Sequence, residues 1–258
     1  MRYFLAVAYE GTHYAGFQIQ DEQETIQSQV TRALETLFRD KFILTGSSRT
    51  DAGVHAEENY FHVDTMVTLT AKHRYNLNAI LPHDIAITGI YQVPETAHCR
   101  FDATERVYKY LIYRYKNPFL TNKGWLYPYP LNLEILDRLS VVLMEYEDFS
   151  SFSKRNTQVL TYNCRIGSAY WEERNHGKLV FHIRSNRFLR GMIRGIVGTM
   201  IRIARSVQTI EEAEAIFRSV IEAKDCSKAD FTTPARGLYL MEVKYPEGLL
   251  KKVDGVER

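Results

Sequence analysis

The segment 47–56 holds the residues of this sequence that are best suited to chemistry. It reads SSRTDAGVHA, with Arg49 two residues before Asp51 and two small residues directly after it. A nearby arginine favours an ionised carboxylate, and small neighbours leave room for a substrate. The segment therefore suits a carboxylate that acts as a nucleophile or base. A structural turn, capped by Asp51 and bent at Gly53, fits the same residues, and the segment alone does not separate the two readings.

Concentrated positive charge is the second chemical feature. The whole chain has a net charge of +2, which identifies no partner. No Asp or Glu occurs between Arg174 and Ile210, yet this window holds eight basic residues: Arg174, Lys178, Arg184, Arg187, Arg190, Arg194, Arg202 and Arg205. The rest of the chain then has 25 basic against 31 acidic residues. A mildly acidic protein with one basic surface suits a polyanionic ligand.

Other site chemistries find little support. Neither His55 nor His62 belongs to an H-E-x-x-H motif, which would indicate a zinc site. The segment GTHYAG is not followed by the G-K-[ST] of a phosphate-binding loop. The cysteines, Cys99, Cys164 and Cys226, stand more than sixty residues apart, which favours neither a zinc site nor a disulfide framework. We therefore expect no metal, no cofactor and reduced cysteines in a cytoplasmic protein. No apolar run approaches the roughly 20 residues of a membrane span, and the N-terminal segment reads as a strand rather than a signal peptide.

The first half of the chain predicts strands that alternate with helices. Apolar residues recur at helical spacing after Thr25, namely Ile26, Val30, Ala33, Leu34 and Leu37. This stripe predicts an amphipathic helix over 25–38, and a second helix is expected over 71–81, ending at Pro82. Strands are expected at 3–9, 42–45, 60–64 and 85–93. The Asp51 segment therefore lies in a loop between two strands.

The second half repeats this mixture. Strands are predicted at 106–115, 166–172, 179–185 and 238–245, and helices at 133–146 and 187–205. Thr209 and Glu212 have the spacing of a capping box that opens a further helix ending near Ala223. Because each half mixes strands with helices, we predict an α+β fold of two related subdomains, residues 1–105 with the Asp51 loop and residues 106–258 with the basic helix.

On a helical wheel, the segment 187–205 separates into two faces. Five arginines fall within an arc of about 120°, and apolar residues such as Ile193 and Ile196 lie opposite. Those arginines are Arg187, Arg190, Arg194, Arg202 and Arg205. Gly191, Gly195 and Gly198 share the basic face, where each interior glycine costs roughly 0.5–1 kcal/mol relative to alanine. Close approach of a phosphate backbone or of another polypeptide segment would explain them, and we expect the arginines to bind phosphates.

The Asp51 loop resembles the G-R-T-D-A-G-V-H-A signature of the TruA family of tRNA pseudouridine synthases. The resemblance continues in order along nearly the whole chain, through YEGTHYAGFQIQ, LNAILPHDI, HCRFDATERVYKY, DFSSF, FLRGMIRGIVGTM and TPARGLYL. It implies the pseudouridine-synthase fold: two ferredoxin-like halves that form a central, mostly antiparallel sheet flanked by helices. The second half would complete the active-site cleft.

The resemblance also implies a reaction and a set of site residues. The family detaches uracil from C1′ of ribose, turns the ring and rejoins it through C5, without a metal or cofactor. Asp51 would act at the sugar, either by attacking C1′ or by removing a ribose proton, and Arg49 would hold its charge. Tyr108 matches the active-site tyrosine expected to stack on uracil, and Arg194 would reach Asp51 or a phosphate. Family members typically modify tRNA positions 38 to 40 in the anticodon arm and act as homodimers.

Some positions depart from the family pattern. Ser48 replaces a usual glycine, so its backbone must adopt dihedrals that a side chain permits. Arg190 and Gly191 replace a histidine pair, and Gly195 replaces the asparagine after the key arginine. The family's G-x-H-D-F is EYEDF here, with Tyr146 and Glu147 near the expected substrate path. Two alternatives therefore remain: a relative that modifies other tRNA or RNA uridines, and a non-catalytic tRNA-binding or tRNA-folding protein.

Overall fold

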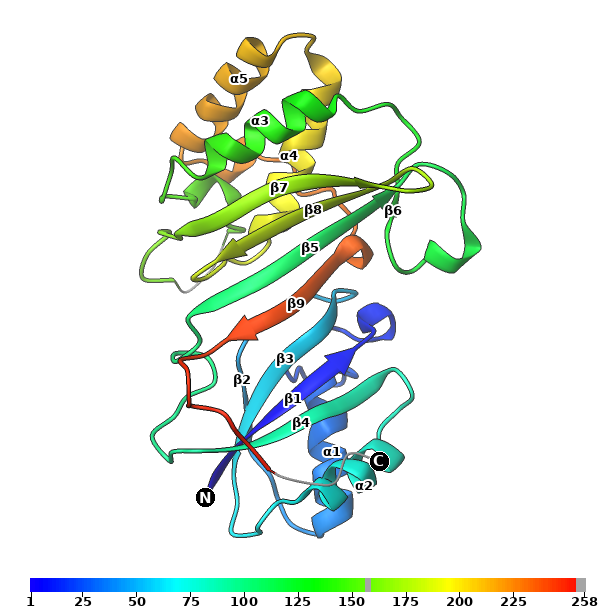
Figure 1. Ribbon diagram of the computed structural model, residues 1–258, viewed down its shortest axis with the longest axis vertical. Coiled ribbons are helices and arrows are strands. Elements are labelled where there is room, and N and C mark those ends of the chain that lie inside the picture. The colour runs from blue at the N-terminus through cyan, green and yellow to red at the C-terminus, as the bar shows by residue number, and fades with distance from the viewer. Residues whose placement is uncertain (156–158, 254–258) are drawn as a thin grey trace. The chain divides into compact units, whose positions relative to one another are not determined.

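The computed structural model of this protein describes residues 1–155 and 159–253 (Figure 1). They form two compact units: one contains Met1–Glu105 together with the described residues from Tyr239 onward, and the other contains Arg106–Leu238. The described residues from Tyr239 onward belong to the first unit because the last strands pair with its sheet. Both units combine a sheet with helices, so the predicted α+β class is confirmed.

The first unit is built on a sheet of mostly antiparallel strands. Its order is β10-β4-β1-β3-β9, and β2 pairs with β3. Their bounds are β1 (Arg2–Tyr9), β2 (Leu44–Gly46), β3 (His55–Asp64), β4 (Ile85–Val93), β9 (Leu238–Lys244) and β10 (Lys251–Lys252). Only the β3–β9 pair of these is parallel, with His55 opposite Tyr239.

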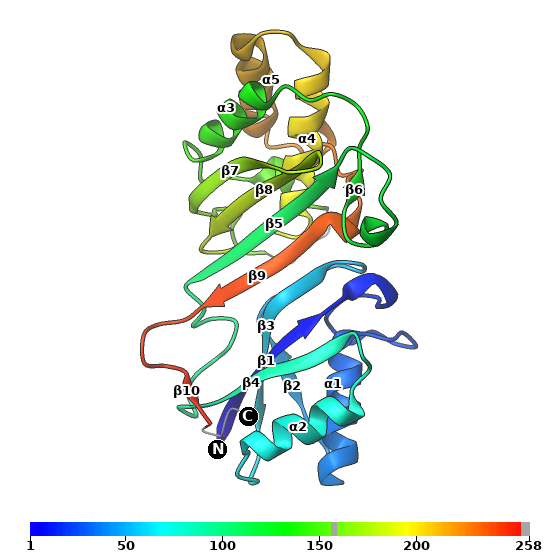
Figure 2. The same cartoon turned by 45° about the vertical axis from the view of Figure 1, so that its right-hand side comes forward.

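Two helices pack in this unit, α1 (Ile26–Phe38) and α2 (Ala71–Ile80) (Figure 2). The Thr25 hydroxyl accepts a hydrogen bond from the backbone of Ser28, and the Ser28 hydroxyl accepts one from the backbone of Thr25, so a capping box starts α1. Ile26, Val30, Ala33 and Leu34 are buried, as the apolar stripe predicted. α2 ends one residue before Leu81, which precedes Pro82.

The second unit packs three helices beside an antiparallel sheet (Figures 1 and 2). The strand order is β5-β8-β7, and the short β6 lies parallel to β5. The strands are β5 (Glu105–Tyr113), β6 (Trp125–Leu126), β7 (Ile166–Arg174) and β8 (Lys178–Ser185), and the helices are α3 (Leu133–Leu143), α4 (Met192–Ser206) and α5 (Ile210–Glu222). The Thr209 side chain caps α5 by accepting a hydrogen bond from the backbone of Glu212. Short 3-10 helices among the described residues are Gly11–His13, Pro118–Leu120, Ser150–Phe152, Cys226–Lys228 and Ala235–Gly237.

The predicted start of the basic helix is wrong. α4 begins at Met192 rather than at residue 187, because Gly191 has a φ of 77° and the chain turns there before the helix starts. Arg187 and Arg190 therefore precede the helix, and only Arg194, Arg202 and Arg205 lie on it. The arginines keep a helical spacing from residue 187 onward although the backbone becomes helical only at Met192. A helical wheel uses the spacing alone and cannot detect this difference.

The three cysteines are free, with Cys99 and Cys164 buried and Cys226 partly exposed. Within residues 1–155 and 159–253, no helix has the length and apolar character needed to cross a membrane.

Candidate active site

Asp51 lies in the loop between β2 and β3 of the first unit. The backbone N–H of Val54 donates to the carbonyl oxygen of Asp51 over 3.2 Å, and Gly53 has a φ of 77°, so the chain turns tightly directly after the aspartate. The Asp51 side chain is half-buried. Arg49 is exposed, and within the described part of the chain its side chain makes no hydrogen bond or ion pair. The structure therefore contains no direct Arg49–Asp51 pair, and a role for Arg49 remains a prediction.

Buried polar groups hold the N-terminal side of this loop. The amide nitrogen of Asn59 donates to the carbonyl oxygen of Ser48 (2.8 Å) and to the hydroxyl of Tyr9 (3.2 Å). The Asn59 amide oxygen accepts from the backbone N–H of Ser48 over 3.3 Å. The Tyr9 and Thr50 hydroxyls are 2.7 Å apart, and the backbone N–H of Phe17 donates to the Thr50 carbonyl (3.1 Å). Sequence reasoning missed Tyr9, Thr50 and Asn59.

Two glycines allow the neighbouring chain to approach this loop closely. Gly16 has a φ of 110°, and a Cβ atom there would lie 2.9 Å from the Thr50 carbonyl oxygen. A Cβ atom on Gly11 would lie 1.9 Å from the Val54 carbonyl oxygen. The glycines of the YEGTHYAG segment therefore brace the Asp51 loop rather than bind phosphate.

Ser48, at the family's glycine position, does not have a positive φ. The expectation that this turn adopts dihedrals open to a side chain is confirmed. Its hydroxyl oxygen is buried and has no hydrogen-bond partner among the described residues. Such a group is costly to bury, so the serine does not stabilise the loop through its hydroxyl.

Tyr108 lies on β5 of the second unit, with its side chain 8% exposed. Its ring meets that of Phe188 edge to face, with centroids 5.1 Å apart and an interplanar angle of 79°. On the same strand, the Arg106 guanidinium donates to the carbonyl oxygen of Asn186 over 2.9 Å. These two contacts hold the segment that follows β8 against β5. Arg187 lies in this segment, directly before Phe188.

Arg194 lies in the first turn of α4 and is paired reciprocally with Thr233. Its Nε donates to the Thr233 carbonyl oxygen (2.8 Å), and the Thr233 hydroxyl donates to the carbonyl oxygen of Arg194 (2.7 Å). Thr233 is fully buried. It belongs to the TPARGLYL segment, so the sequence held a signal for it, but no spacing rule linked it to Arg194.

The glycines of α4 receive another polypeptide segment, which is one of the two explanations expected from the sequence. A Cβ atom on Gly198 would lie 2.3 Å from the carbonyl oxygen of Asp230, and one on Gly195 would lie 2.7 Å from the ring of Phe231. The Asp230 backbone N–H also donates to the Thr199 hydroxyl (2.9 Å). The segment from Asp230 to Thr233 therefore packs directly on the helix, and these two glycines do not leave room for a phosphate.

Three arginines in or just before α4 have a positive charge that no described carboxylate neutralises. Among the described residues, Arg187, Arg202 and Arg205 make no ion pair with a carboxylate. Arg202 donates to the Lys228 carbonyl oxygen (2.8 Å), and the Arg205 guanidinium lies 4.4 Å from the ring centre of Tyr129. Because these partners are uncharged, the cations remain available to a polyanion.

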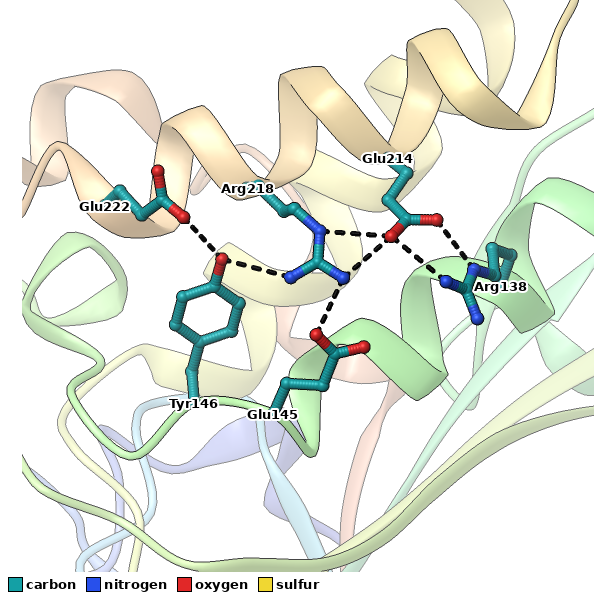
Figure 3. A network of polar contacts seen from close by, with 6 residues as sticks. All are labelled: Arg138, Glu145, Tyr146, Glu214, Arg218 and Glu222. Atoms are coloured by element: carbon teal, nitrogen blue, oxygen red, sulfur yellow. Dashed lines mark hydrogen bonds and ion pairs between the residues drawn. The ribbon is translucent and has the colours of Figure 1, made fainter.

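A network between α3 and α5 shows the opposite arrangement (Figure 3). Glu214 pairs with Arg138 (2.7 Å) and Arg218 (2.7 Å), and Arg218 also reaches Glu145 (2.7 Å). Hydrogen bonds from Arg138 and Arg218 lower the pKa of Glu214 to about 2. Tyr146, one of the departures from the family pattern, donates its hydroxyl to Glu222 (2.6 Å) and accepts from Arg218 (3.2 Å). Its hydroxyl thus joins the segment that follows α3 to α5, and the arginines here are neutralised.

His62, His98 and Cys99 form a cluster in the first unit whose potential ligand atoms lie within 4.8 Å of one another. The Nδ1 atoms of His62 and His98 accept from the backbone N–H groups of Cys99 (3.3 Å) and Arg100 (3.1 Å). The Cys99 thiol donates to the Thr45 carbonyl oxygen (3.1 Å). Since each Nδ1 is an acceptor, each ring carries its proton on Nε2, and neither nitrogen offers a free lone pair to a metal. The cluster therefore suits hydrogen-bonded packing.

We expect His62 to make stability depend on pH. Burial, assisted by the charge of Arg2, lowers the pKa of His62 from 6.5 to about 4. The unfolded chain therefore binds a proton below pH 6.5 that the folded chain does not, and stability falls as the pH drops from about 6.5 toward about 4. Between pH 7 and pH 5, the wild type should lose up to about 2 kcal/mol of unfolding free energy that His62→Asn does not lose. Urea denaturation at both pH values measures this, and equal losses in the two proteins would contradict it.

Sequence comparisons place the chain among known proteins. The model of a family described as tRNA pseudouridine synthase matches residues 5–102 and 146–246. A tRNA pseudouridine synthase A from Parabacteroides distasonis is 42% identical over 260 residues, covering 98% of this chain and 99% of the relative. Proteins of the same name from Bacteroides thetaiotaomicron (40% identical; 97% and 93% covered) and Porphyromonas gingivalis (39%; 96% and 98%) are also similar. The matched spans contain Asp51 and Arg194, whereas Tyr108 lies between them.

Proposed function

Since this chain belongs to the tRNA pseudouridine synthase family, we propose that it isomerises uridines 38, 39 and 40 in the anticodon arm of tRNA with Asp51 as the catalytic carboxylate. Membership makes the protein an isomerase that acts on tRNA uridine. The target positions and the role of Asp51 are the proposed part. The observation that carries them is the Asp51 loop, which lies within the first matched span.

The reaction breaks the bond between N1 of uracil and C1′ of ribose and forms a bond between C5 and C1′. The proton on C5 leaves to water and N1 takes up a proton from water, so the nucleotide keeps its composition. Asp51 acts at the sugar, either by adding to C1′ or by taking a ribose proton, and both routes need its ionised form. No metal, nucleotide cofactor or redox step enters the reaction.

The second unit supplies the binding groups in this proposal. Tyr108 stacks on the uracil, and its edge contact with Phe188 fixes the ring for that purpose. Arg194, in the first turn of α4 and oriented by Thr233, binds a phosphate of the tRNA. Arg187, Arg190 and Arg202 contact the phosphate backbone. The target uridine must leave its stack, at a cost of a few kcal/mol.

Tritium release tests the proposal. With tRNA labelled by tritium at C5 of uridine, the wild type should release one tritium into water for each pseudouridine formed. Chemical mapping of pseudouridine in the product should place the modified bases at positions 38 to 40. Release from other uridines would support the relative with altered targets. Binding of tRNA without release would support the non-catalytic protein and overturn the proposed reaction.

Phosphate binding by the arginines predicts a change in salt dependence. The double variant Arg187→Gln/Arg202→Gln should bind tRNA more weakly and lower the slope of log K against log salt concentration by about 1.5–2. Arg138→Gln removes the same kind of charge from the neutralised network of Figure 3 and should leave the slope unchanged. Filter binding between 50 and 200 mM salt measures both (about the range over which such slopes are resolved). An unchanged slope in the double variant would show that these arginines do not contact phosphate.

A homodimer and a cytoplasmic location complete the proposal. Light scattering on the purified chain would give the mass of a dimer, twice the 30.0 kDa of one chain.

A further inference from the structure

Two buried side chains, Asn59 and Tyr9, hold the segment 48–50, through which the chain leaves the sheet of the first unit and enters the Asp51 loop. Asn59 is fully buried on β3, and Tyr9 (5% exposed) lies at the end of β1. Together they contact Ser48 and Thr50, which flank Arg49 immediately before Asp51. Neither residue takes part in the proposed reaction of Asp51.

The orientation of the Asn59 amide is fixed by its partners. Its oxygen faces two backbone N–H donors, those of Ser48 (3.3 Å) and Tyr60 (2.8 Å), so it must be the acceptor. Its nitrogen then donates both hydrogens, to the Ser48 carbonyl and to the Tyr9 hydroxyl. Asn59 thus pairs with both backbone groups of Ser48, as a neighbouring strand would.

The Tyr9 hydroxyl continues these contacts to Thr50. Because the Tyr9 hydroxyl accepts from Asn59, its own hydrogen is free to point at the Thr50 hydroxyl oxygen, 2.7 Å away. Burial raises the pKa of Tyr9 to about 12, so this hydrogen is present at any physiological pH. The Thr50 residue is also held by Phe17 through its carbonyl oxygen. A chain of hydrogen bonds therefore runs from Asn59 through Tyr9 to Thr50, the residue that precedes Asp51.

We propose that Tyr9 and Asn59 are positioning residues for Asp51, acting through Thr50 and Ser48, and this rests on the proposed function of Asp51. A nucleophile must be held within a fraction of an ångström of its reacting geometry, and a misplacement of about 1 Å costs about 100-fold in rate. The hydrogen bonds of Asn59 and Tyr9 hold the backbone on the N-terminal side of Asp51, and the turn at Gly53 holds the backbone on its C-terminal side. Neither Tyr9 nor Asn59 needs to touch the substrate.

Small changes to the Tyr9–Thr50 bond test this proposal. Tyr9→Phe and Thr50→Val each remove one hydroxyl and conserve shape. Each should lower the single-turnover rate of tritium release by about 10- to 100-fold and leave the Kd for tRNA within about twofold of wild type. Both changes remove the same hydrogen bond, so their effects should not add. The double variant should react at most about threefold more slowly than the slower of the two single variants. Thr50→Ser keeps the hydroxyl that Thr50→Val removes, and its rate of tritium release should be close to that of the wild type.

Tyr3→Phe is the matched control. Tyr3 lies on the same strand, is equally buried, and its hydroxyl accepts from the Leu69 backbone (3.3 Å) away from the loop. This variant should react at the wild-type rate. If Tyr9→Phe and Thr50→Val react as fast as Tyr3→Phe, the positioning role is wrong while the function of Asp51 stands. If the wild type releases no tritium, or if Asp51→Asn reacts like the wild type, both proposals fail together.

Discussion

Asp51→Asn is expected to release tritium from C5-labelled tRNA at least about 10⁴-fold more slowly than the wild type. The amide has nearly the same shape as the carboxylate, but it is neither a nucleophile nor a base at neutral pH. Binding should survive, because the proposed phosphate contacts lie in the second unit. Single-turnover release with excess enzyme measures the chemical step, and filter binding measures the Kd, which we expect within about threefold of wild type.

Asp64→Asn controls for loss of a carboxylate in the same unit. Asp64 pairs with Arg2 (2.7 Å) at the exposed end of β3 and should be dispensable for release. If Asp51→Asn keeps more than about one-hundredth of the wild-type rate, Asp51 is not the essential carboxylate. The family membership would stand, and the transfer of this residue's role from the family would be wrong.

Gly198→Ala is expected to unfold at a lower urea concentration and to lose at least about 2 kcal/mol of stability. Alanine in place of a helix-interior glycine gains about 1 kcal/mol from propensity alone. That gain is outweighed because the new Cβ would lie 2.3 Å from the backbone carbonyl oxygen of Asp230, which cannot move without its neighbours. Since Asp230 leads directly to Thr233, the displacement should also reduce activity through Arg194.

Gly195→Ala separates this clash from helix propensity. It lies on the same helix, and its new Cβ would meet the outer edge of the Phe231 ring at 2.7 Å, which can turn aside. We therefore expect a stability change of about 1 kcal/mol or less in either direction. The same urea titration measures both variants. If Gly198→Ala is as stable as Gly195→Ala, the close packing of Asp230 on α4 is contradicted.

Features that depend on residues close together in the sequence were predictable. The cap at Thr209 and the apolar stripe of α1 lie within a few residues of what they control, and the structure contains both. The start of α4 was not predictable, because a single positive φ at Gly191 ends a spacing pattern that otherwise runs on. A wheel records which residues share a face, but it does not record where the backbone becomes helical.

The site shows the same division between local and distant contacts. Asp51 was found from a contiguous motif. Asn59 contacts Tyr9, fifty residues earlier, and Thr233 contacts Arg194, thirty-nine residues earlier. No periodicity joins such pairs, since they meet only when strands and helices from distant parts of the chain have packed. Contacts between residues far apart in the sequence are therefore harder to predict than a contiguous motif.

The route of the chain through the two units also sets an order for its synthesis. β3 pairs through His55 and Ala56 with β9, whose partners Tyr239 and Leu240 are translated only after the whole second unit. At roughly 5–20 residues per second, a ribosome needs on the order of 10 s to make residues 106–238. During that interval the end of β3 nearest Asp51 is an open sheet edge, the kind of edge at which nascent chains associate wrongly. Translation must therefore almost finish before the first unit can complete its sheet beside the Asp51 loop.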